Sequence, residues 1–151
     1  KDCMLEYGIS LQFCHWYKKY YQVDHSSKIV SLCVLWFDAS MMDIYGAIAN
    51  GAELHIIPEE IRLDFIALQR YFEENGVTHS FMTTQVGRQF AMEMSCESLQ
   101  YLSIGGEKLV PMEPPKDYRF FNAYGPTECT IFTTIFEVDK YYSKHSNWKG
   151  T

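Results

Sequence analysis

The chain contains one nearly continuous apolar run, Lys28-Ile29-Val30-Ser31-Leu32-Cys33-Val34-Leu35, which has the length of a single strand. A strand with one face in water alternates apolar and polar residues, whereas a strand covered on both faces does not. The run therefore predicts a central strand of a parallel sheet. Before it, from about Ser10 to Tyr21, apolar residues recur at helical spacing, so a helix is expected there.

Helix-like and strand-like stretches continue to alternate after this run. Ser40 followed by Asp43 resembles a capping box, and the helix that it would start carries its apolar face on Met41, Ile44, Tyr45 and Ile48. Asp64 is a good N-cap for a second helix, which Asn75-Gly76 would close. Thr83 or Thr84 would cap a third.

Short strands are predicted over 53–57, 77–82, 99–104, 119–123 and 130–138. The resulting order is α-β-α-β-α-β-α-β-β-β, which indicates an α/β fold with a mostly parallel sheet flanked by helices. In such sheets a ligand binds beyond the carboxyl ends of the strands. The loops that leave those ends are therefore the candidate site.

Composition and charge narrow the class of protein. The 151 residues are 47% hydrophobic and 21% charged, which is typical of a globular domain. The net charge of −6 argues against nucleic acid and against an anionic membrane as partners. No apolar run approaches the roughly 18–20 residues of a membrane-spanning helix. Five scattered cysteines without a CxxC pair, and no signal-peptide core at the N-terminus, predict a cytoplasmic protein with reduced thiols.

Each of the three candidate loops has a simple structural explanation as well. Asp38 follows a very apolar strand, where a carboxylate is costly unless it is paired, so it either caps the next helix or binds a cation or ammonium group. Gly105-Gly106 allows the backbone to approach a flat or charged ligand, although a plain turn is the simpler explanation.

The third loop, Tyr124-Gly125-Pro126-Thr127-Glu128, combines an aromatic ring, a hydroxyl and a carboxylate within five residues. The ring offers a stacking face, the hydroxyl can bond a phosphate, and the carboxylate is a hard ligand for Mg²⁺. The set suits a magnesium nucleotide, and an exposed turn is the alternative.

Other chemistries find little support in the sequence. The five histidines show no metal-ligand spacing with one another or with cysteine. There is no GxSxG nucleophile elbow and no GxGxxG or GxxxxGK[ST] phosphate loop.

Three segments together resemble the adenylation domains of nonribosomal peptide synthetases. They are Phe37-Asp38-Ala39-Ser40, Gly105-Gly106-Glu107 and the string NAYGPTE from Asn122 to Glu128. These domains belong to the adenylate-forming superfamily of acyl- and aryl-CoA ligases and luciferases. The resemblance covers about Met4 to Val138. It implies that residues 1–138 are a core fragment of the large N-terminal subdomain, holding the amino-acid pocket and part of the ATP site. Residues 139–151 are expected to be a polar, poorly ordered tail.

The resemblance implies an activity and a set of roles. The family forms an aminoacyl-adenylate from an amino acid and Mg·ATP and passes the acyl group to the phosphopantetheine of a carrier domain. Tyr124 would stack on adenine, Asn122 would contact the edge of adenine, and the backbone of Gly105, Gly106 and Glu107 would line the nucleotide. Thr127 would hold the α-phosphate as a catalytic group. Glu128 would be the Mg²⁺ ligand.

By the same resemblance, Asp38 would pair with the α-ammonium group of the substrate. The residues that line the side-chain pocket are mostly apolar and carry no second charge, which implies an apolar, uncharged α-amino acid. These residues are Ala39, Met42, Phe81, Ser103, Gly105, Ala123, Ile131 and Phe132.

By the resemblance, the family's Gly-rich ATP loop lies just upstream of Lys1, which matches at most its last Lys, and the C-terminal subdomain with a catalytic Lys lies downstream of this chain. We therefore expect the 151-residue chain alone to be inactive, with the missing subdomain and a peptidyl carrier domain as partners, and any self-association of the isolated piece to be an artefact. Two alternatives stay open. In the first, the chain would be a degenerate, non-catalytic scaffold or binding module. In the second, it would derive from an acyl- or aryl-CoA ligase, whose substrate has no ammonium group to pair with Asp38.

Overall fold

The computed structural model describes residues 7–33, 38–125 and 133–143. Helices and strands alternate in the predicted order, with one short 3₁₀ turn, η1, added. The elements are α1 (Tyr7–Tyr20), β1 (Lys28–Ser31), α2 (Asp38–Asn50), β2 (Glu53–Ile56), η1 (Glu59–Ile61), α3 (Phe65–Asn75), β3 (His79–Thr83), α4 (Thr84–Glu93), β4 (Tyr101–Gly105), β5 (Arg119–Tyr124) and β6 (Thr134–Glu137).

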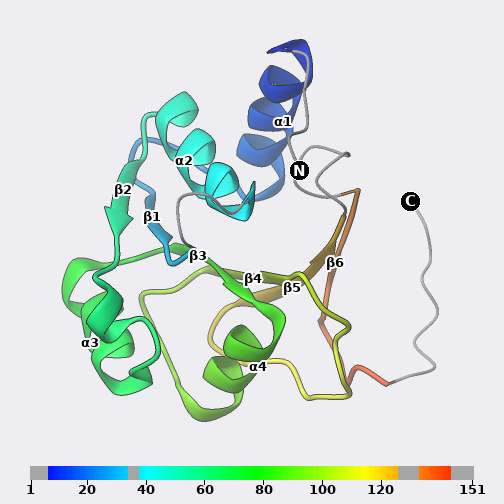
Figure 1. Cartoon of the computed structure of the whole chain (residues 1–151). Coiled ribbons are helices and arrows are strands. Elements are labelled where there is room, and N and C mark those ends of the chain that lie inside the picture. Colours follow the sequence, from blue (N-terminus) through cyan, green and yellow to red (C-terminus); the bar gives the residue numbers. More distant parts are fainter. Residues whose placement is uncertain (1–6, 34–37, 126–132, 144–151) are drawn as a thin grey trace.

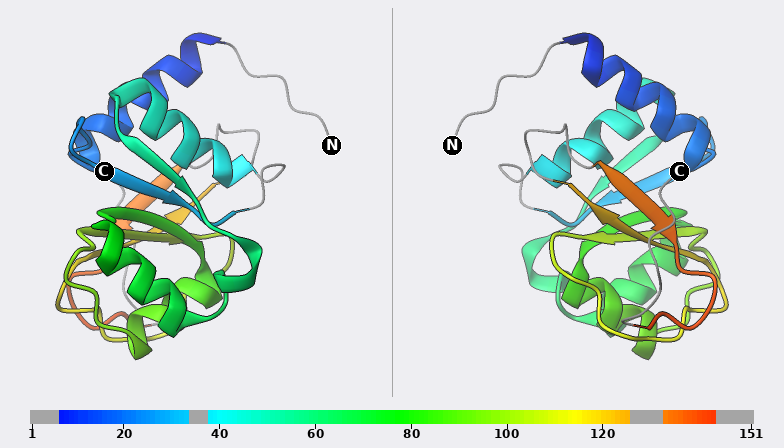
Figure 2. Two further views of the ribbon diagram at one scale, coloured as in Figure 1. Left: turned by 90° about the vertical axis from the view of Figure 1, so that its left-hand side faces the viewer. Right: turned by 90° about the vertical axis from the view of Figure 1, so that its right-hand side faces the viewer.

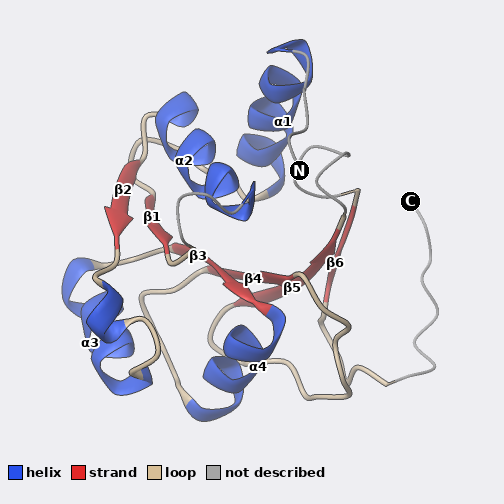
Figure 3. Ribbon diagram, in the orientation of Figure 1, coloured by secondary structure: helices blue, strands red, loops and turns tan. Residues whose placement is uncertain are grey.

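The strands form one sheet in the order β2-β1-β3-β4-β5-β6 (Figure 3). Neighbouring strands from β2 to β5 are parallel, and β6 runs antiparallel to β5. This confirms the predicted α/β class with a mostly parallel sheet. The chain leaves β1 outward to β2 and returns to the other side of β1 as β3. The sheet therefore has a topological switch point between β1 and β3, where such folds bind ligands.

Helices cover both faces of the sheet (Figures 1 and 2). α1 and α2 lie on one face, and α3 and α4 on the other. Consecutive strand residues contribute to opposite cores: Ile29 belongs to the core under α1 and α2, whereas Val30 belongs to the core under α3 and α4, and both are fully buried. The apolar run therefore lacks alternation because β1 is covered on both faces, as predicted.

The predicted boundaries of α3 are confirmed. The Asp64 carboxylate accepts a hydrogen bond from the Ala67 amide at 3.0 Å, which satisfies one of the free N–H groups of the first turn. Gly76 ends the helix in the left-handed conformation with φ of 64°.

The predicted start and apolar face of α2 are wrong. The helix begins at Asp38, so Ser40 lies inside the first turn and the proposed capping box with Asp43 does not form the helix start. Tyr45 and Ile48, expected in the core, are 46% and 69% exposed. The buried face instead consists of small and polar residues together with one methionine: Ala39, Ser40, Met42, Asp43 and Ala47.

A close approach between α1 and α2 explains the buried face of α2. A Cβ added to Gly46 would lie 2.4 Å from the ring of Tyr17, so the helices meet where α2 has no side chain. Tyr17 is itself buried in this contact. Hydrophobic spacing alone could not predict this orientation, since the larger apolar residues of α2 point elsewhere.

Two predicted strands are shorter in the structure. β1 ends at Ser31 rather than Leu35, and β6 spans Thr134–Glu137 rather than 130–138. Parts of both predictions, 34–37 and 130–132, lie outside the described residues. Within the predicted tail, Tyr142 forms an antiparallel bridge with Met112, so packing continues a few residues past Val138. The boundary at residue 138 stays a prediction. None of the described helices is long and apolar enough to cross a membrane.

Gly87→Ala is expected to destabilise the fold by about 2–3 kcal/mol through overpacking. Helix α4 lies so close to the sheet that a Cβ at Gly87 would approach Ile104 Cγ2 to 2.3 Å and Met82 Cβ to 3.0 Å. Denaturant unfolding of the variant measures the loss. Gly8→Ala is the matched control, because Gly8 lies in α1 with nothing within 4 Å of its Cβ position. Equal stability of the two variants would contradict the tight packing of α4.

Candidate active site

The carboxyl ends of the central strands meet at one edge of the sheet. Thr83, Gly105 and Ala123 lie in register across β3, β4 and β5, and Ala123 also pairs with Ile135 of β6. Helix α2 begins at this edge with Asp38, after the segment that follows β1. The structure therefore brings together the start of α2 and the described parts of the other two loops that the sequence singled out.

The described residues of the predicted side-chain pocket share the α1–α2 face of the sheet. Phe81, Ser103 and Phe121 are in register across β3, β4 and β5, and Phe81 packs in one cluster with Ala39 and Met42 of α2. All six described pocket residues are buried. They are Ala39, Met42, Phe81, Ser103, Gly105 and Ala123.

Gly105 has no room for a side chain. A Cβ there would lie 2.9 Å from the Ala123 carbonyl oxygen and 3.2 Å from the Phe81 ring. The large Phe81 and the absent side chain of Gly105 are therefore complementary in volume. The next residue, Gly106, has φ of 102°, a conformation that favours glycine.

Thr84 fixes the loop that follows β4. Its hydroxyl donates to the Glu107 carbonyl at 3.0 Å and accepts from the Glu107 amide at 3.1 Å. The sequence suggested Thr83 or Thr84 only as a helix cap, and the Thr83 side chain forms no cap hydrogen bond. The structure shows that Thr84, the first residue of α4, instead shapes the predicted nucleotide loop.

Asn122 and Tyr124 differ in burial. Asn122 pairs with Ile104 and Phe136, is buried, and its Oδ1 accepts no hydrogen bond from the described residues. Tyr124, the last residue of β5, is 61% exposed. An exposed ring near a buried amide oxygen that lacks a partner among the described residues suits a flat ligand with a hydrogen-bonding edge.

Ser103 is tied to a residue that the sequence did not single out. Its hydroxyl donates to the Tyr21 hydroxyl at 2.7 Å, across a separation of 82 residues. Tyr21 follows the last residue of α1 and is buried, and this burial raises the pKa of its hydroxyl. No pattern in the sequence signals this pair.

Several predicted site residues lie outside the description. Thr127, Glu128, Ile131 and Phe132 fall in the undescribed segment 126–132, and for Asp38 only the backbone position is described. Their roles stay predictions. Among the described residues, no group of three or more His, Cys, Asp or Glu side chains is arranged to hold a metal ion.

Asp43 is a buried carboxyl group beside the candidate pocket, on α2. It is fully buried, and neither oxygen has a hydrogen-bond partner among the described residues. Burial raises its pKa well above the ordinary value near 3.8, and the nearby Ser31 hydroxyl lowers it only in part, without forming a hydrogen bond of normal geometry.

Asp43→Asn is expected to stabilise the chain by about 1–2 kcal/mol at pH 7. Because the folded-state pKa is raised, the folded chain keeps a proton that the unfolded chain loses above about pH 4. The free energy of unfolding of the wild type therefore falls as the pH rises from about 4 up to the folded-state pKa. Denaturant unfolding at pH 4 and pH 7 should show the gain at pH 7 and little gain at pH 4.

The matched control is Asp24→Asn. Asp24 accepts hydrogen bonds from the Ser26 amide at 2.8 Å and the Ser26 hydroxyl at 2.6 Å, and these bonds lower its pKa. Its carboxylate stabilises the fold above the ordinary carboxyl range, so this variant should lose stability at pH 7 and not at low pH. A loss of stability in Asp43→Asn at pH 7 would contradict the assignment of Asp43.

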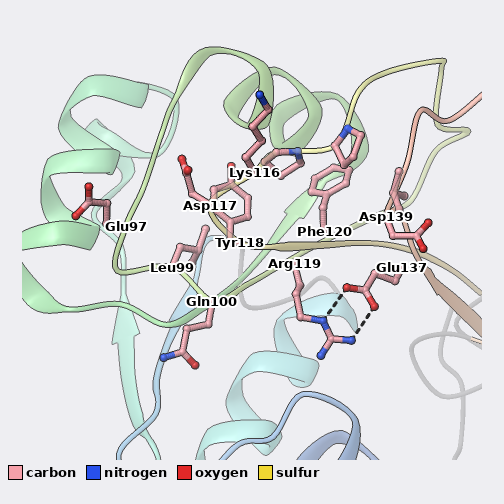
Figure 4. A pocket seen from close by; sticks show the side chains of 13 residues that line it. Glu97, Leu99, Gln100, Lys116, Asp117, Tyr118, Arg119, Phe120, Glu137 and Asp139 are labelled. Atoms are coloured by element: carbon pink, nitrogen blue, oxygen red, sulfur yellow. Dashed lines mark hydrogen bonds and ion pairs between the residues drawn. The ribbon is translucent and has the colours of Figure 1, made fainter.

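A hollow of about 460 Å³ lies at the opposite edge of the sheet, by the amino ends of β4 and β5 (Figure 4). Arg119 and Glu137 form a bidentate ion pair there, with two distances of 2.7 Å, which lowers the pKa of Glu137. Arg119 also lies over the ring of Tyr101 at 5.3 Å. Because the two charges are paired with each other, neither is available to bind a ligand in the hollow.

Comparison with known proteins shows the family. The sequence model described as "AMP-binding enzyme" matches residues 1–148. The chain belongs to this family.

The similar curated proteins are large synthases. The chain is 38% identical to surfactin synthase subunit 2 of Bacillus subtilis (strain 168) over 138 residues, covering 91% of this chain and 4% of that protein. It is 34% identical to bacitracin synthase 1 of Bacillus licheniformis over 140 residues, covering 93% of this chain and 3% of that protein. The resemblance to nonribosomal peptide synthetase adenylation domains is thereby confirmed. The chain spans only a few per cent of these relatives.

Solved structures share the fold. One is the Vibrio cholerae adenylation domain AlmE in complex with glycyl-adenosine-5'-phosphate, with a TM-score of 0.76 and 21% identity over 90% of this chain and 27% of that one. Another is the nonribosomal peptide synthetase FmoA3, with a TM-score of 0.75 and 18% identity over 87% of this chain and 15% of that one. The fold is therefore that of an adenylation domain.

Proposed function

We propose that this chain is the part of an amino-acid-activating adenylation enzyme that holds the amino acid and one side of the ATP site. The observation that carries the proposal is the convergence, at one sheet edge, of the start of α2, the glycine pair after β4 and the end of β5. The AMP-binding family match and the synthase relatives support the same reading. Because the reaction consumes ATP, we expect it to take place in the cytoplasm.

The reaction joins two substrates. The carboxylate of the amino acid attacks the α-phosphorus of ATP, the bond to the β-phosphate oxygen breaks, and pyrophosphate leaves. Asp38 would hold the α-ammonium group and so orient the carboxylate, and Thr127 would hold the α-phosphate. When bound, Mg²⁺ offsets the charge that develops on the phosphate, and Glu128 would be its ligand. The thiol of a carrier domain's phosphopantetheine then takes the acyl group and releases AMP.

The described residues fit a nucleotide at this edge. The exposed ring of Tyr124 is available for stacking on adenine, and the buried Oδ1 of Asn122, which lacks a partner among the described residues, can accept a hydrogen bond from the adenine amine. Gly105, Gly106 and the Thr84-held Glu107 would line the nucleotide through their backbone.

The described pocket wall fits an uncharged, apolar α-amino acid. Its side chains are buried and none carries a charge. Ala39, Met42, Phe81 and Ala123 are apolar, and the one hydroxyl, that of Ser103, is hydrogen-bonded to Tyr21. Ile131 and Phe132 would complete this wall. In AlmE the bound adenylate carries a glycyl group, an uncharged amino acid.

The test is amino-acid-dependent ATP–pyrophosphate exchange by the complete enzyme that contains this chain, with the twenty amino acids and a set of fatty and aryl acids. Exchange with one or a few apolar amino acids would support the proposal. Exchange with fatty or aryl acids alone would favour the acyl- or aryl-CoA ligase alternative. A folded complete protein without exchange would favour the scaffold. The 151-residue chain, which spans 27% of the AlmE chain, is expected to give no exchange by itself.

A further inference from the structure

The hydrogen bond between Ser103 and Tyr21 ties a residue of the predicted amino-acid pocket to a residue outside it. Both residues are 98% buried, and the two hydroxyl oxygens are 2.7 Å apart. Phe81, a pocket residue, is in register with Ser103 on the next strand. Phe81 and Met42 belong to the same packed cluster as Tyr21. Tyr21 therefore packs with the predicted pocket residues and contacts one of them through its hydroxyl.

Tyr21 is held rigidly in this position. Its ring packs against five other aromatic rings with centroid distances from 4.8 to 6.0 Å: Trp16, Tyr17, Tyr20, Tyr101 and Phe121. In addition, His79 Nε2 donates a hydrogen bond to the Tyr21 carbonyl at 2.8 Å. Such packing fixes the hydroxyl at one point, so its effect on Ser103 is constant rather than adaptable.

We propose that Tyr21 is a specificity-determining residue that acts on the substrate side chain through Ser103. The inference rests on the proposed function, since it takes Ser103 as a wall of the amino-acid pocket. Ser103 contributes a hydroxyl to a wall that is otherwise apolar. Because Tyr21 accepts the proton of that hydroxyl, Ser103 can still accept a hydrogen bond from a ligand but can donate none to it. The pocket wall thus lacks a hydrogen-bond donor at Ser103, and it favours an apolar side chain over a hydroxyl or amide isostere whose oxygen would need one.

A purely structural role is the competing explanation. The bond joins the end of α1 to β4, so it also contributes to stability. A structural role predicts a loss of activity with all amino acids alike. A role in specificity predicts a change in the ratio between two substrates of the same shape, which a uniform loss of folded enzyme leaves unchanged.

The experiment measures kcat/KM for ATP–pyrophosphate exchange by the complete enzyme with the isosteric pairs valine–threonine and leucine–asparagine. Tyr21→Phe keeps the ring and removes the hydroxyl that engages Ser103. We expect the apolar-to-polar ratio to fall by about 3–10-fold, the range of one hydrogen bond gained by the polar substrate. In the Ser103→Ala background, the same Tyr21→Phe change should leave the ratio unaltered, because the group through which it acts is absent.

Tyr20→Phe is the matched control. Tyr20 is the adjacent residue and its ring lies 5.3 Å from that of Tyr21, so it reports any general disturbance of the aromatic cluster. Its substrate ratio should equal that of the wild type. Should Tyr21→Phe fail to fold, Ser103→Ala removes the wall hydroxyl itself. Its apolar-to-polar ratio should then equal or exceed that of the wild type, and a fall in this ratio would overturn the inference.

Each outcome has one meaning. Three results together support the inference. The apolar-to-polar ratio falls in Tyr21→Phe, it stays at the wild-type value in Tyr20→Phe, and adding Tyr21→Phe to Ser103→Ala does not change it. An active wild type whose ratio is unchanged by Tyr21→Phe overturns it, and so does an equal change in the Ser103→Ala background. A folded complete wild type without any amino-acid-dependent exchange contradicts the proposed function itself, and the inference falls with it.

Discussion

Asp38→Ala is expected to reduce kcat/KM for the amino acid by about 100-fold or more in the complete enzyme, because it leaves the substrate ammonium group without its counter-charge. Helix α2 begins at Asp38, and the next two residues, Ala39 and Ser40, are buried. A carboxylate at a helix N-terminus is favoured by the helix dipole. Amino-acid-dependent exchange and calorimetric binding of the free amino acid measure the effect.

The matched control for this change is Asp64→Ala. Asp64 also stands at the start of a helix, but it caps α3 through the Ala67 amide, on the face of the sheet away from the pocket. This variant should lose about 1 kcal/mol of stability and keep its kcat/KM for the amino acid. Asp38→Asn should resemble Asp38→Ala, since it keeps the size of the side chain and removes the charge. Normal amino-acid binding by Asp38→Ala would show that Asp38 only caps α2.

Sequence patterns were sufficient where the determinants are local. The element order, the unalternating β1 and both ends of α3 follow from residues that lie next to each other in the chain, such as Asp64 before the helix and Gly76 after it. The ligand edge also follows, because parallel strands place all their carboxyl ends together.

Sequence patterns failed where a distant partner decides the outcome. The buried face of α2 is set by the Tyr17 ring against Gly46, a contact that hydrophobic spacing does not record. The bonds of Thr84 to Glu107 and of Ser103 to Tyr21 join residues 23 and 82 positions apart. These hydrogen bonds join common polar residues that belong to no recognisable motif, so only the fold reveals that these residues shape the candidate site.

Glu128→Ala is expected to lower kcat/KM for Mg·ATP by about 100-fold in the complete enzyme while sparing binding of the free amino acid. The reason is that the carboxylate would hold the metal that offsets phosphate charge, and it has no role toward the ammonium group. Glu128 itself lies outside the described residues. Its described flanks lie at the ligand edge, where the Thr133 amide donates to the Tyr124 carbonyl at 2.9 Å.

Glu137→Gln separates this effect from a general loss of acidic charge. Glu137 lies nine residues after Glu128 in the sequence but pairs with Arg119 at the opposite edge of the sheet. The exchange kinetics of the Glu137→Gln variant with ATP should therefore match those of the wild type. The two active-site variants should then fail in opposite ways, Asp38→Ala toward the amino acid and Glu128→Ala toward Mg·ATP. If both variants impaired both ligands equally, the division of the site into an ammonium pocket and a metal–nucleotide loop would be wrong.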